Sequence, residues 1–95
     1  MDFIKIKDIF SSPDIDKTVT IGGWVRAFRA KKFIELNDGS TINNIQCVIS
    51  DTSIDEKIIK KISIGCSLKI KGKITKSIGK GQSFEIQILN IKLLG

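Results

Sequence analysis

Apolar residues recur along the chain in two different spacings, and each spacing predicts one type of element. At the start, Ile6, Ile9 and Phe10 stand three and four residues apart, which is the spacing of one helix face. They predict a short helix over residues 3–10, which the polar, proline-containing run 11–14 ends. Beyond this run the apolar period changes to two, which is typical of half-buried β-strands.

The alternating segments predict five strands, at about residues 17–29, 32–37, 43–50, 67–75 and 83–93. The Gly22-Gly23 pair inside the first strand predicts a bend or bulge, as small barrels need at their corners. We interpret the neighbouring Trp24 as a packing residue at that bend. Asp38-Gly39-Ser40 is a strong turn signal between the second and third strands.

A longer helix is predicted over residues 51–65, between the third and fourth strands. Ser53 with Glu56 three residues later has the pattern of a capping box, with the serine as N-cap. Gly65 is the expected C-terminal cap. The apolar stripe of this helix consists of Ile54, Ile58, Ile59 and Ile62.

Three strands, a helix and two more strands are the arrangement of an OB-fold, a small Greek-key barrel. The expected fold class is therefore an all-β, five-stranded barrel with a short N-terminal helix. Closing the sheet also removes the exposed edges that an open five-stranded sheet would have. The length of 95 residues, 41% of them apolar, predicts a single domain over residues 1–95.

The charge balance favours a polyanionic partner. Lys and Arg number 16 against 10 Asp and Glu, which gives a net charge of +6. Lys69, Lys71 and Lys73 form a stripe on one face of the fourth strand. We interpret that stripe as a source of solubility and edge protection rather than as a track for phosphates.

The residue types that are missing exclude several classes of function. The chain has no histidine, the commonest general base and neutral metal ligand. Cys47 and Cys66 have no CxxC spacing and predict reduced thiols in a cytoplasmic setting. Neither a signal-peptide core nor an apolar run of about 20 residues is visible. We expect a cytoplasmic domain without metal, cofactor or membrane partner that is not an enzyme by itself.

Strand parity places a set of recognition side chains on the outside of the barrel. Five positions alternate with positions predicted to face the core, so they point outward: Phe33, Glu35, Gln46, Glu85 and Gln87. Arg29, at the end of the first strand, borders Phe33. An aromatic face accepts a stacked base, while amides and carboxylates bind base edges. The predicted core positions are Ile34, Leu36, Ile45, Cys47, Ile49, Phe84, Ile86 and Ile88.

These residues also carry a family resemblance that covers nearly the whole chain. The sequence resembles the N-terminal anticodon-binding domain of asparaginyl-tRNA synthetase, a domain that the aspartyl and lysyl enzymes share. The stretches 36–40 and 81–85 look most like the asparagine branch, whereas the first hairpin, with three residues between Arg29 and Phe33, is shorter than is usual. The matching motifs are Gly23-Trp24-Val25-Arg26, Arg29, Phe33-Ile34-Glu35-Leu36-Asn37-Asp38-Gly39-Ser40, Ile45-Gln46 and Gly81-Gln82-Ser83-Phe84-Glu85-Ile86.

The resemblance implies a tRNA partner and a role for each of four residues. Phe33 would stack on the central anticodon base, and Gln46 would hydrogen-bond to the same uridine. Glu85 would lie near the first anticodon base, where a carboxylate accepts from a guanine edge. Arg29 would contact the anticodon backbone or stack beside it.

Members of the family continue into a class II catalytic domain that binds ATP and magnesium and forms homodimers. None of the motifs of that domain is present, so we expect an excised domain without aminoacylation chemistry of its own. The same residues are also compatible with a free-standing relative and with the aspartyl-tRNA synthetase counterpart. A general single-strand-binding OB domain would use a similar surface, and so would a protein-interaction barrel whose Phe33 is buried in a partner.

Overall fold

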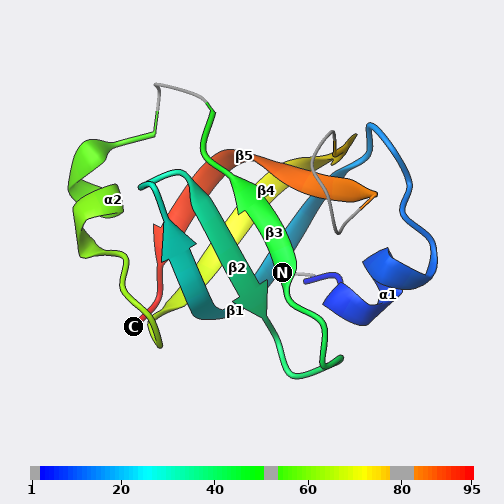
Figure 1. Ribbon diagram of the computed structural model, residues 1–95, viewed down its shortest axis with the longest axis horizontal. Helices are drawn as coiled ribbons and strands as arrows, with labels where there is room; N and C mark the ends of the chain where they lie inside the picture. Colours follow the sequence, from blue (N-terminus) through cyan, green and yellow to red (C-terminus); the bar gives the residue numbers. More distant parts are fainter. Residues whose placement is uncertain (1–2, 51–53, 78–82) are drawn as a thin grey trace.

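The strands of the chain close into a barrel, with a helix at each end of the view in Figure 1. The structure is a computed structural model that describes residues 3–50, 54–77 and 83–95. The elements are α1 (Ile6–Ser11), β1 (Thr18–Arg29), β2 (Phe33–Asn37), β3 (Ile45–Val48), α2 (Glu56–Lys61), β4 (Ser67–Lys76) and β5 (Phe84–Leu93).

The strand order is β1-β2-β3-β5-β4, and β4 returns to β1 to close the barrel. Only β3 and β5 pair in parallel among the described strands. This topology confirms the predicted five-stranded OB-fold, with a short helix before β1 and another between β3 and β4.

β1 belongs to both halves of the barrel. Its first part, up to Trp24, pairs with β4, and its second part pairs with β2. The bulge lies between Val25 and Ala27 in the pairing with β2, whereas the pairing with β4 is regular through Gly22-Gly23. The predicted bulge at the glycine pair is therefore wrong by a few residues. Gly23 instead allows a close approach of the two backbones, because a Cβ there would lie 2.5 Å from the carbonyl oxygen of Asn37.

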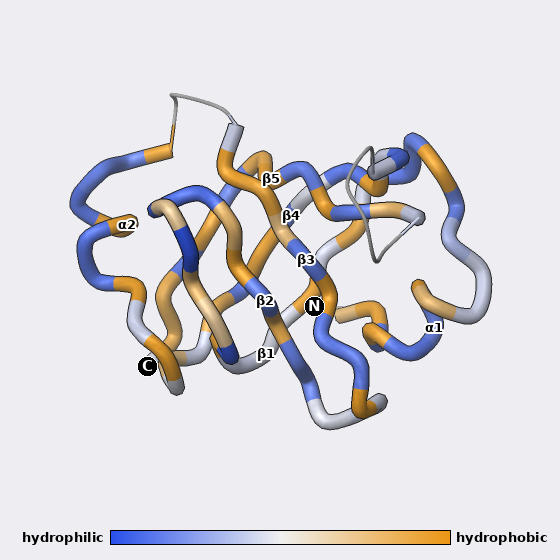
Figure 2. The backbone as a smooth tube through the Cα atoms, in the orientation of Figure 1, coloured by the Kyte–Doolittle hydropathy of each residue, from blue (hydrophilic) through white to orange (hydrophobic). Residues whose placement is uncertain are grey.

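The predicted alternation of core and surface positions is confirmed, and Figure 2 shows it as alternating hydrophobic and hydrophilic segments along the strands. Of the predicted core positions only Ile49 is half-buried, and the others are buried. The interpretation of Trp24 as a packing residue is wrong, because its side chain is 51% exposed on the opposite parity from buried Val25.

The helix α2 is shorter than predicted. Its N-cap is Asp55, whose side chain accepts the backbone N–H of Lys57 at 2.9 Å. The expected start at residue 51 and the expected N-cap Ser53 lie outside the described residues. The C-cap is Ile62 rather than Gly65, which instead has φ +93° in the turn that follows. Ile62 is buried on extended backbone, so the apolar spacing continues beyond the helix itself.

Candidate nucleic-acid interface

Three polar side chains form a row across the outer face of β2, β3 and β5. Glu35 is the cross-strand partner of Gln46. Gln46 and Glu85 precede the paired residues Cys47 and Ile86, so they occupy neighbouring positions at the start of the β3–β5 pairing. All three are half-buried. With Phe33 and Arg29 they form a surface that we call the outer strip.

Phe33 occupies the outer strip at the start of β2. Its cross-strand partners are Arg29 on β1 and Val48 on β3. Val48 is only 5% exposed but is not a member of the core cluster, and Phe33 does not pack against that cluster either. The ammonium group of Lys32 lies 5.6 Å from the centroid of the Phe33 ring. The ring is therefore a half-buried group outside the core, with a cation beside it.

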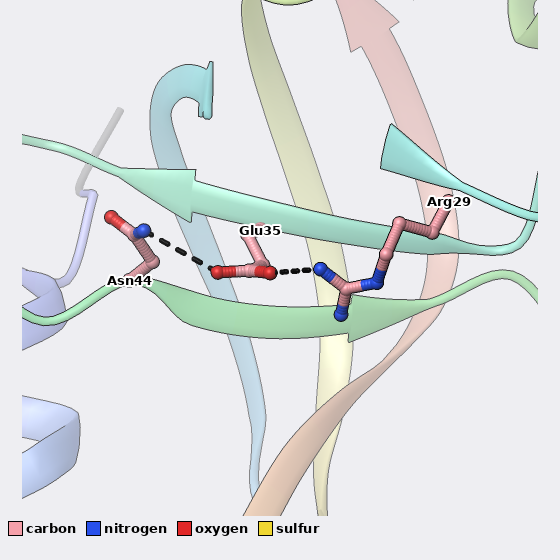
Figure 3. A network of polar contacts seen from close by, with 3 residues as sticks. All are labelled: Arg29, Glu35 and Asn44. Carbon is pink, nitrogen blue, oxygen red and sulfur yellow. Dashed lines mark hydrogen bonds and ion pairs between the residues drawn. The ribbon is translucent and has the colours of Figure 1, made fainter. Parts of the chain in front are cut away.

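Arg29 is paired within the outer strip (Figure 3). Its guanidinium forms a salt bridge with the Glu35 carboxylate, and the side-chain amide of Asn44 donates to the same carboxylate at 3.4 Å. The hydrogen bond from Arg29 lowers the pKa of Glu35, burial opposes it, and the bond from Asn44 and the charge of Arg29 add to the lowering. Glu35 therefore carries a stable negative charge in the middle of the strip.

The hairpin before Phe33 holds Arg29 in this position. The backbone N–H of Lys32 donates to the carbonyl of Arg29 at 3.0 Å. Between them Ala30 and Lys31 have φ values of +55° and +52°. Two successive left-handed residues are the signature of a type I′ turn, which suits the twist of a tight hairpin. The short hairpin thus places Arg29 directly opposite Phe33.

Glu85 lies at the β5 end of the row, between β3 and β4. Its backbone carbonyl accepts the hydroxyl of Thr75, its partner on β4, at 3.5 Å. Burial, and then the negative charge of Glu85, raise the pKa of the Cys47 thiol on β3.

The four residues predicted for the site therefore share one face of the barrel. An aromatic ring, an amide, carboxylates and a guanidinium on the outer face of a barrel are suited to unpaired bases and their phosphates. Sequence reasoning placed Glu35 outside but missed its pairing with Arg29, and it missed Asn44 altogether. The outward parity of Glu35 and the short hairpin were the available signals, because diagonal neighbours on adjacent strands lie within reach of long side chains.

Among residues 3–50, 54–77 and 83–95, no group of three or more His, Cys, Asp or Glu side chains could hold a metal ion. Within the same ranges no helix is long and apolar enough to cross a bilayer.

Comparison with known proteins shows similarity over most of the chain. Residues 19–94 match the tRNA anti-codon profile, which is described as an OB-fold nucleic acid binding domain. The asparagine–tRNA ligase of Phocaeicola vulgatus is 44% identical over 94 residues, which are 96% of this chain and 20% of the ligase.

Solved structures agree with this match. An asparaginyl-tRNA synthetase from Entamoeba histolytica superposes with a TM-score of 0.72 at 29% identity, over 88% of this chain and 22% of that one. The asparaginyl-tRNA synthetase from Pyrococcus horikoshii, complexed with asparaginyl-adenylate, shares the fold with a TM-score of 0.81 at 17% identity. That match covers 99% of this chain and 22% of the synthetase. The chain thus spans about a fifth of the length of the ligases that it matches.

Proposed function

Since the chain belongs to the tRNA anti-codon family of OB-fold nucleic acid binding domains, we propose that it recognises the anticodon loop of an asparagine tRNA. The match to asparagine–tRNA ligases at 44% identity supports the choice of amino acid. The observation that carries the proposal is the outer strip itself, where an aromatic ring outside the core lies beside a row of base-reading polar groups.

Four of the five residues of the strip contact RNA in the proposal. Phe33 stacks on the central anticodon base, and Gln46 hydrogen-bonds to the same base on the neighbouring strand. Glu85, at the β5 end of the row, accepts from the edge of the first base. Arg29 contacts the backbone of the loop, and for this its guanidinium exchanges part of its pairing with Glu35 for a phosphate.

The proposal also places the chain in a larger enzyme. We propose that residues 1–95 form the anticodon-binding domain of a cytoplasmic, homodimeric asparagine–tRNA ligase. That ligase would attach asparagine to its tRNA with ATP and magnesium.

Fluorescence anisotropy with labelled anticodon stem-loops tests the proposal. We expect the GUU loop to bind most tightly, and the change of its central base in GAU to cost more affinity than the change to GUC. Similar affinity for all three loops would make the chain a general single-strand binder. Binding to none of them at low salt would contradict RNA recognition by this domain.

Two aromatic substitutions provide a matched comparison. Phe33→Ala should weaken binding of the GUU loop by about 1–3 kcal/mol, because one base loses its stacking partner. Trp24→Ala removes an exposed aromatic side chain at the position opposite Asn37 rather than in the strip. It should leave RNA affinity unchanged. Circular dichroism of both variants confirms that the barrel is folded, and an unfolded Phe33→Ala would show that the ring is structural.

A further inference from the structure

A second surface of the barrel has the properties of a binding site. A hollow of about 470 Å³ lies on the outer face of β4 and β5. Of these two strands, β4 pairs with the first half of β1, whereas the outer strip adjoins its second half. We call this surface the lysine hollow. It is lined by Thr20, Lys69, Lys71, Leu89, Asn90 and Lys92.

The register of the strands brings these side chains together. Lys71 on β4 stands between Thr20 on β1 and Asn90 on β5. In the neighbouring row Lys69 is directly opposite Lys92. The three ammonium groups therefore come from adjacent positions on one face of the sheet.

A bulge in β5 completes the hollow. Lys71 pairs with Asn90 and Gly72 with Ile88, which leaves Leu89 as the extra residue. Leu89 and Asn90 are both exposed, although strict alternation would turn one of them inward. Bulges of this kind re-aim side chains and are frequent beside functional sites.

The lysines of the hollow are not explained by the fold. Lys69 and Lys92 are like charges in directly opposed positions, which destabilises a sheet. Within the described parts of the chain none of the three lysines has an ion-pair partner, whereas Lys73 of the same strand lies 3.7 Å from Asp16. The lysine stripe of β4 does not protect a sheet edge, so that part of its interpretation is wrong: β4 is paired on both sides in the closed barrel.

We propose that the lysine hollow binds phosphate groups of an RNA backbone, as a contact surface separate from the outer strip. Its three ammonium groups supply charge for the phosphates, and the Thr20 hydroxyl and Asn90 amide supply neutral hydrogen bonds. RNA is the polyanion that the family membership of the chain favours. The proposal adds to the proposed function but does not require that the anticodon is read.

A blunt RNA duplex of about ten base pairs is the probe, because its internal bases are paired and stacked and cannot be splayed onto Phe33, so that it offers mainly backbone. In the test variant Lys69, Lys71 and Lys92 are replaced by glutamine. In the control variant Lys7, Lys57 and Lys61, from helices at opposite ends of Figure 1, are replaced instead. Each variant lowers the net charge from +6 by three.

We expect the test variant to lose at least tenfold in duplex affinity at 50 mM salt, and the control variant less than threefold. The negative slope of log affinity against log salt should become shallower by about 0.9 for each phosphate that the variant no longer neutralises. Phe33→Ala should leave duplex binding unchanged. Lys71→Glu is a second, single substitution, and it should weaken binding in the same direction if the triple variant does not fold.

Four results would overturn the proposal. They are equal losses in the test and control variants, equal loss in Phe33→Ala, no duplex binding by the wild type at 50 mM salt, and binding to anionic phospholipid vesicles without binding to the duplex. A preference for the GUU stem-loop that persists in any of these cases would leave the proposed function intact, because that preference is measured separately.

Discussion

The carboxylate of Asp38, in the turn after β2, accepts the backbone N–H of Ile6 at 2.9 Å across a sequence separation of 32. It also accepts the N–H of Ser40 at 3.0 Å, and the Ser40 hydroxyl in turn accepts the N–H of Lys7. The first N–H groups of a helix have no partner within it, and Lys5 at the N-cap provides no side-chain bond. The turn between β2 and β3 therefore caps α1.

Asp38→Ala should lower the free energy of unfolding by about 1–2 kcal/mol, the usual cost of removing a helix cap. Chemical denaturation with urea measures this change. Asp14→Ala removes a carboxylate from the exposed loop before β1 and should change stability by less than about 0.5 kcal/mol. Equal losses in the two variants would show that the hydrogen bond between Asp38 and Ile6 does not stabilise the fold.

The same hydrogen bond predicts how stability depends on pH. Burial alone would raise the pKa of Asp38, but hydrogen bonds from Ser40 and from the Ile6 backbone outweigh it and lower the pKa. The carboxyl group of Asp38 therefore holds its proton less tightly in the folded state than in the unfolded state. The stabilisation is complete above the unfolded value of about 3.9 and is lost as the pH falls through the folded value. Unfolding curves between pH 6 and 2 should show a smaller acid loss for Asp38→Asn than for the wild type.

The two adjacent glycines of β1 should respond differently to alanine. A Cβ on Gly23 would lie 2.5 Å from the backbone oxygen of Asn37, which cannot move without disturbing β2. Gly23→Ala should therefore cost about 1–3 kcal/mol. A Cβ on Gly22 meets only the ring of Phe3 at 3.2 Å, and that side chain is 47% exposed and free to shift. Gly22→Ala should be nearly neutral. Thermal unfolding of the two variants distinguishes them, and similar melting temperatures would contradict the close approach.

Away from the bulges, period-two alternation predicted the faces of the strand residues correctly, because a strand in a small barrel has only a core side and an outer side. The outward positions of Phe33, Gln46 and Glu85 follow from that alone. The helical spacing of apolar residues misjudged the length of α2, because Ile54 and Ile62 have that spacing but lie outside Glu56–Lys61. Burial of apolar side chains requires the spacing but not a continuous helix.

Contacts that depend on register or on distant segments could not be predicted. The pairing of Arg29 with Glu35 requires the exact alignment of β1 with β2, which the bulge after Val25 shifts. The hydrogen bond between Asp38 and Ile6 joins two segments that no local pattern connects. The lysine hollow likewise depends on a bulge at Leu89, which the alternation of β5 does not reveal.

The hairpin between β1 and β2 can be stabilised at Lys31. Its φ of +52° is a left-handed conformation that costs an ordinary side chain roughly 1–2 kcal/mol and costs glycine little. Lys31→Gly should raise the free energy of unfolding by about 0.5–1 kcal/mol after the greater entropy of unfolded glycine is included. Lys32→Gly, at a position without positive φ, should destabilise the protein instead. The same sign for both variants would contradict a left-handed turn.

Glu35→Gln should strengthen RNA binding, and this prediction rests on the proposed function. The substitution removes a negative charge from the outer strip and releases the Arg29 guanidinium to pair with a phosphate. The negative slope of log affinity against log salt should then become steeper by about 0.7, the value for one further single-strand phosphate. Stability should change by less than about 1 kcal/mol, because the Arg29 side chain is 55% exposed. Combining the substitution with Arg29→Ala should abolish the gain. Weaker binding by Glu35→Gln alone would instead show that the salt bridge positions Arg29 or that Glu35 itself contacts a base.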